Sequence, residues 1–310
     1  MALQHAQKLL SDPCKFNAQV SQSASGTHLI DLGVQAHGGL AAGKLLAEAC
    51  LSGLGEVNFV PTQLAGVQTS VTVATDHPVQ ACMGSQYAGW QISIDKFFGM
   101  GSGPMRLLAK KEPLIKELQI NDTSDVAVGI LETAQIPCDK VCTQIAEQCG
   151  VSPEKLYLLV AKTSSLAGHI QIVARSVETA MHKLHELKFD INQVKSGFAS
   201  APLPPISADD VVGIGRTNDA ILYGGQVTLW VDAEDQLIEE IGPQLPSSAS
   251  AMYGKPFETI LREAKFDFYK IDPLLFSPAK IQLASLRTGR SWTFGEVNEK
   301  ILDASFQGNI

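Results

Sequence analysis

The chain is poor in cysteine, with six in 310 residues, and so sparse a set builds no disulfide framework. Cys138, Cys142 and Cys149 are separated by three and six residues, which matches no common zinc pattern, and the seven histidines include no HExxH. We therefore expect buried free thiols and no metal site. A GxSxG elbow is missing as well, so nothing indicates an α/β-hydrolase nucleophile.

A surplus of basic residues is also missing. The 24 lysines and arginines against 32 acidic residues give a formal charge of −8, which argues against nucleic acid or an anionic membrane as the main partner. No apolar run approaches the roughly 18 residues of a membrane span. The first residues do not show a basic segment followed by an apolar core, as a secretory signal would. We expect a soluble, cytoplasmic protein without a membrane partner.

What is present is an ordinary globular composition, 45% hydrophobic and 18% charged. A chain of 310 residues is long for one core, which predicts two domains with approximate halves 1–150 and 151–310. Residues 200–209 (SAPLPPISAD) contain three prolines and form the clearest linker-like break. Strand and helix patterns alternate without a steady βαβ rhythm, so we predict an α+β fold rather than a doubly wound α/β fold.

One helical pattern, over residues 163–187, dominates the second half of the chain. Its polar side carries Gln171, Arg175, Glu178 and His182. Arg175 and Glu178 are three residues apart, near enough for guanidinium and carboxylate to meet. Facing water, they are a minor surface ion pair; facing a cleft, the carboxylate is a candidate base. Periodicity leaves both interpretations open. The opposite, apolar side is formed by Leu166, Ile170, Val173, Val177, Met181 and Leu184.

Three glycine-rich stretches can be compared with the known nucleotide-binding motifs. Residues 38–44 (GGLAAGK) fit the phosphate-loop spacing, but Leu45 stands where that motif needs Ser or Thr to hold magnesium. We therefore favour a tight turn that enters a helix, whose free N–H groups still suit an anion. Residues 99–103 and 213–215 lack the full GxGxxG and its acidic partner, so dinucleotide binding is weakly supported.

Two polar clusters flank expected strands. Asp76, His77, Ser85 and Gln86 lie within a few residues of a strand end. Residues 215–219 (GRTND) precede an apolar segment, 220–223, that we expect to be a strand. Turn formation alone accounts for the Asn-Asp pair, while projection into a pocket accounts for it equally well.

Five stretches, spread from about residue 33 to 225, carry a resemblance to a known family. They are GVQAHGGLAAGKLLAEACLSGLG, ATDHPVQACMGSQYAGW, FFGMGSGPMR, KTSSLAGHIQIVARSVET and GRTNDAILYGG, the last highly specific. Together they resemble methenyltetrahydromethanopterin cyclohydrolase, a pterin one-carbon enzyme. The resemblance implies reversible hydrolysis of a cationic N5,N10-methenyl group to a 5-formyl group. It also implies two intertwined α+β domains with a large pocket between them, assembled as a homotrimer.

The resemblance also assigns site residues. In the family's ARxxE motif, Arg175 and Glu178 are the implied catalytic pair. The methenyl carbon is electrophilic without a Lewis acid, so what remains is to position and deprotonate a water, with Glu178 as general base. Arg175 would orient the carboxylate and stabilise charge on the tetrahedral intermediate. No metal or cofactor is expected, the pterin being the substrate. The expected pocket contacts lie in the matching motifs: Asp76, Gln86, Arg216, Thr217 and Asp219.

Two alternatives stay open at the level of sequence. The first is a non-catalytic pterin-binding homologue, against which the presence of both Arg175 and Glu178 argues. The second is a nucleotide-binding protein that uses residues 38–44, against which Leu45 argues.

Overall fold

The computed structural model describes residues 1–120 and 122–307, and they form two compact units. The first contains Met1–Gly55 and Gln80–Gln171; the second contains Glu56–Val79 and the chain from Ile172 onward. The polypeptide therefore enters the second unit, returns to the first and leaves it again, which confirms two intertwined α+β domains. The boundaries differ from contiguous halves 1–150 and 151–310, because 56–79 belongs with the C-terminal part and 151–171 with the N-terminal part.

The first unit is built on a mixed six-stranded sheet with the order β1-β2-β8-β7-β6-β5. The neighbouring strands β2, β8 and β7 are parallel, and β1, β6 and β5 each pair antiparallel with their neighbours. The strands are β1 (Gln19–Gln22), β2 (His28–Asp31), β5 (Trp90–Ile94), β6 (Phe97–Ser102), β7 (Ala127–Glu132) and β8 (Leu156–Ala161). The helices are α1 (Ala2–Ser11), α2 (Leu40–Cys50), a π-helix (Val79–Gln86), α3 (Met105–Ala109), α4 (Pro113–Glu117), α5 (Asp139–Cys149) and α6 (Leu166–Val173).

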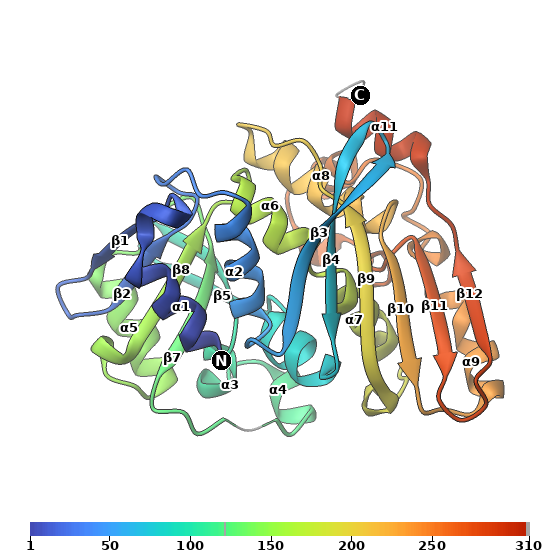
Figure 1. The fold of residues 1–310 in the computed structure, drawn as a ribbon, viewed down its shortest axis with the longest axis horizontal. Coiled ribbons are helices and arrows are strands. Elements are labelled where there is room, and N and C mark those ends of the chain that lie inside the picture. Colours follow the sequence, from blue (N-terminus) through green and yellow to red (C-terminus); the bar gives the residue numbers. More distant parts are fainter. Residues whose placement is uncertain (121, 308–310) are drawn as a thin grey trace. The chain divides into compact units, whose positions relative to one another are not determined.

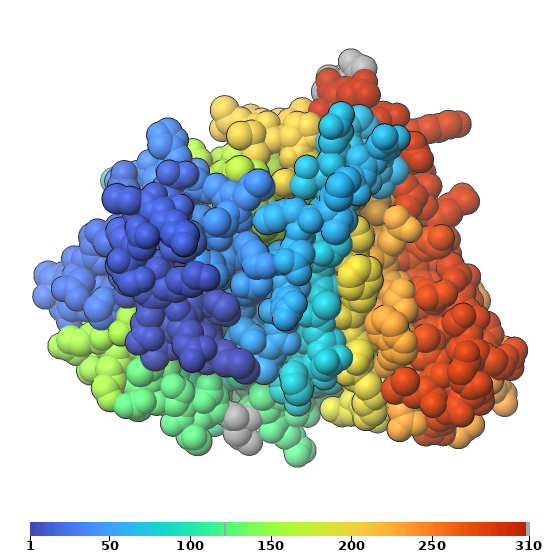
Figure 2. Space-filling view, viewed as in Figure 1, coloured from blue at the N-terminus to red at the C-terminus, as the bar shows by residue number. Residues whose placement is uncertain are grey.

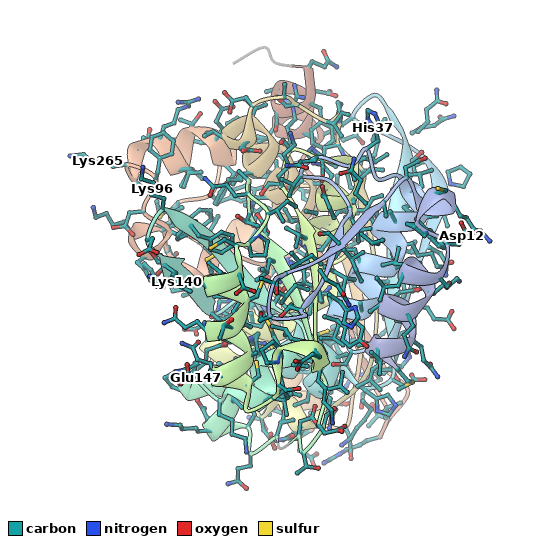
Figure 3. All side chains as sticks on the ribbon, turned by 90° about the vertical axis from the view of Figure 1, so that its left-hand side faces the viewer. Asp12, His37, Lys96, Lys140, Glu147 and Lys265 are labelled. Carbon is teal, nitrogen blue, oxygen red and sulfur yellow. The ribbon has the colours of Figure 1, made fainter. Side chains whose placement is uncertain are left out.

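Helices cover both faces of this sheet, with α1 and α2 on one side and α5 on the other (Figure 1). Alternate residues of β8 therefore enter two different cores: Leu159 packs toward α1 and α2, and Leu158 toward α5. Because both faces of β8 are buried, its sequence is a continuous apolar run. The outer side of α5 carries Lys140 and Glu147, which point away from the sheet in Figure 3.

The second unit is built on another mixed sheet, with the order β12-β11-β10-β9-β4-β3. Only β10 and β11 are a parallel pair among the registers described. The strands are β3 (Gly55–Leu64), β4 (Val67–Thr75), β9 (Val194–Pro202), β10 (Gln226–Val231), β11 (Lys280–Ser285) and β12 (Ser291–Gly295). The helices are α7 (Ser176–Glu186), α8 (Asp210–Leu222), α9 (Asp235–Ile241), α10 (Phe257–Glu263) and α11 (Glu299–Gln307).

One face of this second sheet is packed and the other is open. Val177 of α7 packs against Gly197 of β9 on the covered face. On the opposite face the side chains of β9 and β10 lie uncovered, as Figure 2 shows for the yellow and orange strands. The large apolar side chains of Phe198 and Trp230 are exposed there by 43% and 37%. A hollow of about 310 Å³ on this face is lined by Phe198, Thr228 and Gln282 among others.

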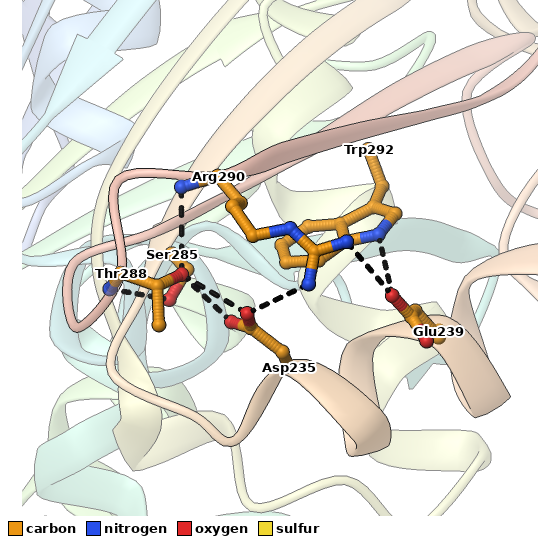
Figure 4. Close-up of polar contacts among 6 residues, drawn as sticks. All are labelled: Asp235, Glu239, Ser285, Thr288, Arg290 and Trp292. Carbon is orange, nitrogen blue, oxygen red and sulfur yellow. Dashed lines mark hydrogen bonds and ion pairs between the residues drawn. The ribbon is translucent and has the colours of Figure 1, made fainter.

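The edge strand β12 is fastened to α9 by polar contacts (Figure 4). Arg290 bonds Asp235 at 3.2 Å and Glu239 at 3.3 Å, and the Trp292 indole donates to Glu239 at 3.1 Å. Thr288 also donates to Asp235, at 2.9 Å. These contacts join α9 to β12 through Trp292 and to the segment before β12 through Thr288 and Arg290.

Several expected elements are confirmed and two expectations about the chain's organisation are wrong. Residues 220–223 are the end of helix α8 and the following residue, not a strand. The proline-rich segment 200–209 is no domain linker, because both of its ends lie in the second unit, at the end of β9 and the N-cap of α8. The expectation of buried free thiols is confirmed for four of the six cysteines and is wrong for Cys14 and Cys138, which are free but exposed. Within the described residues, no helix is both long and apolar enough to cross a membrane.

Candidate active site

The predicted helix over residues 163–187 is two helices. α6 ends at Val173, and α7 begins at Ser176 with Arg175 as its N-cap residue. The Arg175 amide bonds back only three residues, to the Ile172 carbonyl at 2.9 Å, and the Ser176 hydroxyl bonds the Val173 carbonyl at 2.9 Å. A serine that bonds a nearby carbonyl competes with the helix, which explains the interruption. The break gives the candidate residues a helix N-terminus of their own.

Glu178 therefore lies in the first turn of α7, one turn after the N-cap residue Arg175. Unbonded N–H groups and the helix dipole stabilise negative charge at this end of a helix. Arg175 is 8% exposed and Glu178 6%, so neither is a surface residue. The interpretation as a solvated ion pair is excluded, while the catalytic role of the two residues stays a prediction.

A glycine of β9 sets how closely the start of α7 approaches the sheet. Val177, between the two candidate residues, packs on Gly197 so tightly that a β-carbon there would lie 2.7 Å from a Val177 methyl group. Real β-carbons do not approach other atoms so closely. Gly197 is therefore part of the support beneath Arg175 and Glu178.

Asp76 follows β4 directly and is exposed. Its carboxylate accepts a hydrogen bond from the Ser196 hydroxyl at 2.7 Å. Because side chains alternate along a strand, Ser196 points to the face opposite the one on which Gly197 receives Val177. Asp76 is therefore turned toward the open face of its sheet, away from α7.

Gln86 ends the π-helix of the first unit and has no exposed surface. The main-chain carbonyl oxygen of Gln86 lies 3.9 Å from the Cys50 sulfur. The same sulfur contacts the Ser102 hydroxyl at 3.3 Å and the side-chain amide oxygen of Gln171 at 4.0 Å. Three buried oxygen atoms therefore lie around the Cys50 thiol. Gln171, which sequence places on the same polar side as Arg175, is 2% exposed.

Arg216 and Thr217 lie on α8 rather than in a turn, and their observed partners belong to the second unit. The Arg216 guanidinium donates to the carbonyls of Ser305 and Pro205, both at 3.2 Å. The Thr217 hydroxyl donates to the Gly213 carbonyl at 2.9 Å within its own helix and is fully buried. These are contacts that stabilise the fold, and contact with a substrate stays a prediction.

Among the predicted substrate contacts, Asp219 has a buried carboxyl group that bonds another helix. Its carboxylate accepts the backbone N–H of Phe257, the first residue of α10, at 2.8 Å, and the side chain is fully buried. Burial raises the pKa of the Asp219 carboxyl to about 7, and hydrogen bonds from Ser305 and Phe257 only partly oppose this. Asp219 thus joins α8 to α10, and its role as a substrate contact stays a prediction.

The raised pKa of Asp219 predicts a stability change with pH. The folded state holds this proton up to about pH 7, whereas the unfolded chain releases it near pH 4. Between these values, wild-type stability should fall relative to Asp219→Asn as pH rises, by at most about 1.4 kcal/mol per pH unit. Urea unfolding of both proteins at several pH values from 4.5 to 8 measures this. A constant difference would contradict it, and a higher KM in folded Asp219→Asn would indicate substrate contact.

The glycine-rich segment 38–44 is a closed turn into α2. Gly38 has φ +60°, and a β-carbon there would overlap the Leu32 carbonyl oxygen. Asn17 closes the turn, accepting the Gly38 N–H at 3.0 Å and donating to its carbonyl at 3.1 Å. Lys44 lies 3.6 Å from Glu48, along the helix. This geometry agrees with the turn interpretation. Among the residues described, no group of three or more His, Cys, Asp or Glu side chains is placed to hold a metal ion.

The first unit contains a buried ion pair, Arg106 with Glu112, that the sequence does not predict. Arg106 is 1% exposed and Glu112 8%, and the guanidinium holds the carboxylate through Nε at 2.8 Å and through Nη2. Arg106 belongs to the FFGMGSGPMR motif, so the motif could have indicated that this arginine matters. Nothing in the motif shows which residue the arginine contacts.

Two separate mixed sheets and a buried carboxylate at a helix start define an α+β protein with a candidate hydrolytic site. The chain belongs to the cyclohydrolase (MCH) family, whose sequence model matches residues 1–306.

Named relatives make the resemblance specific. The chain is 46% identical over 290 residues to the methenyltetrahydromethanopterin cyclohydrolase of Rhodopirellula baltica, covering 91% of this chain and 86% of that protein. The Methylobacillus flagellatus protein of the same name is 46% identical over 288 residues, with 93% and 88% covered. That of Methanococcoides burtonii is 44% identical over 285 residues, with 91% and 89% covered.

Proposed function

We propose that this protein catalyses the reversible hydrolysis of N5,N10-methenyltetrahydromethanopterin to the 5-formyl compound. Membership of the family and the shared name of its relatives support the activity. The observation that carries the site is the burial of Arg175 and Glu178 at the start of α7. Buried titratable groups are concentrated at functional sites, which supports this assignment.

The chemistry needs one base and no metal. Water attacks the electrophilic methenyl carbon while Glu178 takes one of its protons, and the positive charge of the amidinium is neutralised in a tetrahedral carbinol. The bond from this carbon to N10 then breaks, N10 takes up a proton, and loss of the hydroxyl proton leaves the formyl C=O on N5. One proton is released overall. We propose no cofactor, because the substrate itself supplies the electrophile.

Arg175 is proposed to orient the Glu178 carboxylate and to stabilise negative charge on oxygen during attack. The ionised carboxylate also attracts the cationic substrate. Asp76, Gln86 and Arg216 are proposed as contacts of the pterin or its tail. Thr217 and Asp219 are proposed as contacts of the same substrate, in addition to the hydrogen bonds that Thr217 makes within α8 and Asp219 makes to α10.

We further propose that the two units act as one functional unit, that the protein is cytoplasmic, and that it assembles as a homotrimer. The open face of the second sheet supports self-association. Lys280 alone is charged among the residues that line the hollow on this face, and the face exposes Phe198 and Trp230, a composition that suits a protein interface.

Turnover of the methenyl pterin by the wild-type protein tests the proposal. We expect the absorbance of the methenyl compound to decay many times faster than in buffer, with the 5-formyl compound as product. Bound pterin without decay would favour the non-catalytic alternative. Ribonucleotide binding in the absence of pterin would favour the nucleotide-binding alternative.

A further inference from the structure

The C-terminal end of the π-helix Val79–Gln86 lies against the buried side chain of Arg106. An i to i+5 helix leaves its last carbonyls without partners in the helix, and here the Tyr87 N–H bonds the Cys82 carbonyl at 2.8 Å. Nη1 of Arg106 donates to the next three carbonyls, of Met83, Gly84 and Ser85, at 3.2, 3.0 and 3.2 Å. One guanidinium thus satisfies the end of the helix, where positive charge is favourable.

The chain then wraps around the same guanidinium. The Tyr87 ring centre lies 5.2 Å from the guanidinium carbon, and Glu112 binds its other edge. Gly89 lies so close that a β-carbon would overlap a Glu112 carboxylate oxygen and come within 2.7 Å of the Tyr87 ring. Residues 83–89 are therefore shaped around Arg106.

A second set of contacts fixes the same segment from the other side. The Ser85 hydroxyl donates to the Cys50 carbonyl at 2.6 Å and accepts from Ser52 at 2.8 Å. The Ser85 carbonyl also accepts the Gly103 N–H at 2.8 Å. This leaves little freedom in the backbone that carries Gln86.

We propose that Arg106 is a positioning residue for the pterin reaction, which holds residues 83–86 so that the Gln86 amide meets the substrate. The inference rests on the proposed function. An amide side chain offers both a donor and an acceptor, as the edge of a pterin ring requires. Gln86 is fully buried, so its amide meets only a group that enters the protein interior, and a small backbone shift removes it from hydrogen-bond range.

A purely structural role is the competing explanation. Burial of a guanidinium and a carboxylate contributes little to stability compared with apolar residues of the same size. The π-helix adds weight to a functional role, because such helices are rare and frequently occur at functional sites.

The test is the kinetics of Arg106→Lys, with rates expressed per folded protein. Lysine keeps the charge but cannot bond three carbonyls and Glu112 together. We expect KM for the methenyl pterin to rise about tenfold and kcat to change less than about threefold, as for lost binding. Leu9→Ala, in the core of the same unit, is the control: it should lower the melting temperature and leave KM unchanged.

Coupling to Gln86 completes the experiment. In a Gln86→Ala background, which itself raises KM, Arg106→Lys should raise KM no further. If Arg106→Lys does not fold, Gly89→Ala displaces Glu112 without changing any charge and should raise KM in the same way.

Unchanged KM in the folded variants, or effects of Arg106→Lys and Gln86→Ala that simply multiply, would overturn the inference and leave Arg106 a structural residue. Absence of turnover by the wild-type protein would instead refute the proposed function.

Discussion

Glu178→Gln is expected to lower kcat by about 10³-fold, the range in which general-base catalysis contributes. The substitution keeps the size and the hydrogen-bonding oxygen of the side chain but cannot take a proton from water. KM should rise less than about tenfold, since only the attraction between carboxylate and cation is lost. Steady-state decay of the methenyl absorbance measures both constants.

The matched control is Glu186→Gln, on the last turn of the same helix. Glu186 is half-buried and lies 3.7 Å from His182, so it resembles Glu178 in chemistry but not in position. Its kcat should equal that of the wild type. Full activity in Glu178→Gln would show that another group removes the proton.

Gly197→Ala is expected to lower kcat/KM at least tenfold although residue 197 touches no substrate. The added β-carbon would lie 2.7 Å from a Val177 methyl group, and valine has little freedom to turn about χ1. The first turn of α7 must then move off the sheet, and small displacements of catalytic groups are costly. Kinetics of the folded variant measure the loss.

A second substitution separates this displacement from general damage. In Gly197→Ala combined with Val177→Ala, the methyl group that causes the overlap is gone, so kcat/KM should recover at least partly. Wild-type kinetics in folded Gly197→Ala would show that the start of α7 does not depend on this contact. Failure of the double variant to recover would point to the sheet itself.

Strands and helices with strong patterns were predictable from sequence. The run LYLLVA became β8 because both of its faces are covered by helices, and the amphipathic pattern around residues 139–149 became α5. The chain crossing at Glu56–Val79 was not predictable, because no change of composition marks a segment whose partners in the sheet, such as β9, are more than a hundred residues away.

The break inside residues 163–187 shows the limit of periodicity. Its apolar stripe continues in phase across the interruption, while the interruption depends on one serine hydroxyl that bonds a carbonyl. Burial of the polar side was equally invisible, since Arg175 and Glu178 look the same on a solvated helix.

Residues 215–219 show the opposite error. Glycine and Asn-Asp favour a turn locally, but the segment is helical because Arg216, Thr217 and Asp219 each find partners in α8, α10 or the chain beyond it. Tertiary contacts outweighed the local preference. Family motifs identified these residues as important without distinguishing a substrate contact from a buried support.

The most direct test of the hydrolytic site is the crystal structure of Glu178→Gln with the methenyl pterin bound. We expect the methenyl carbon to lie at the start of α7, with a water molecule between it and the residue 178 amide and with the Arg175 guanidinium in contact with that amide or water. A pterin whose methenyl carbon lies away from α7, with Arg175 and residue 178 contacting only protein, would contradict this expectation.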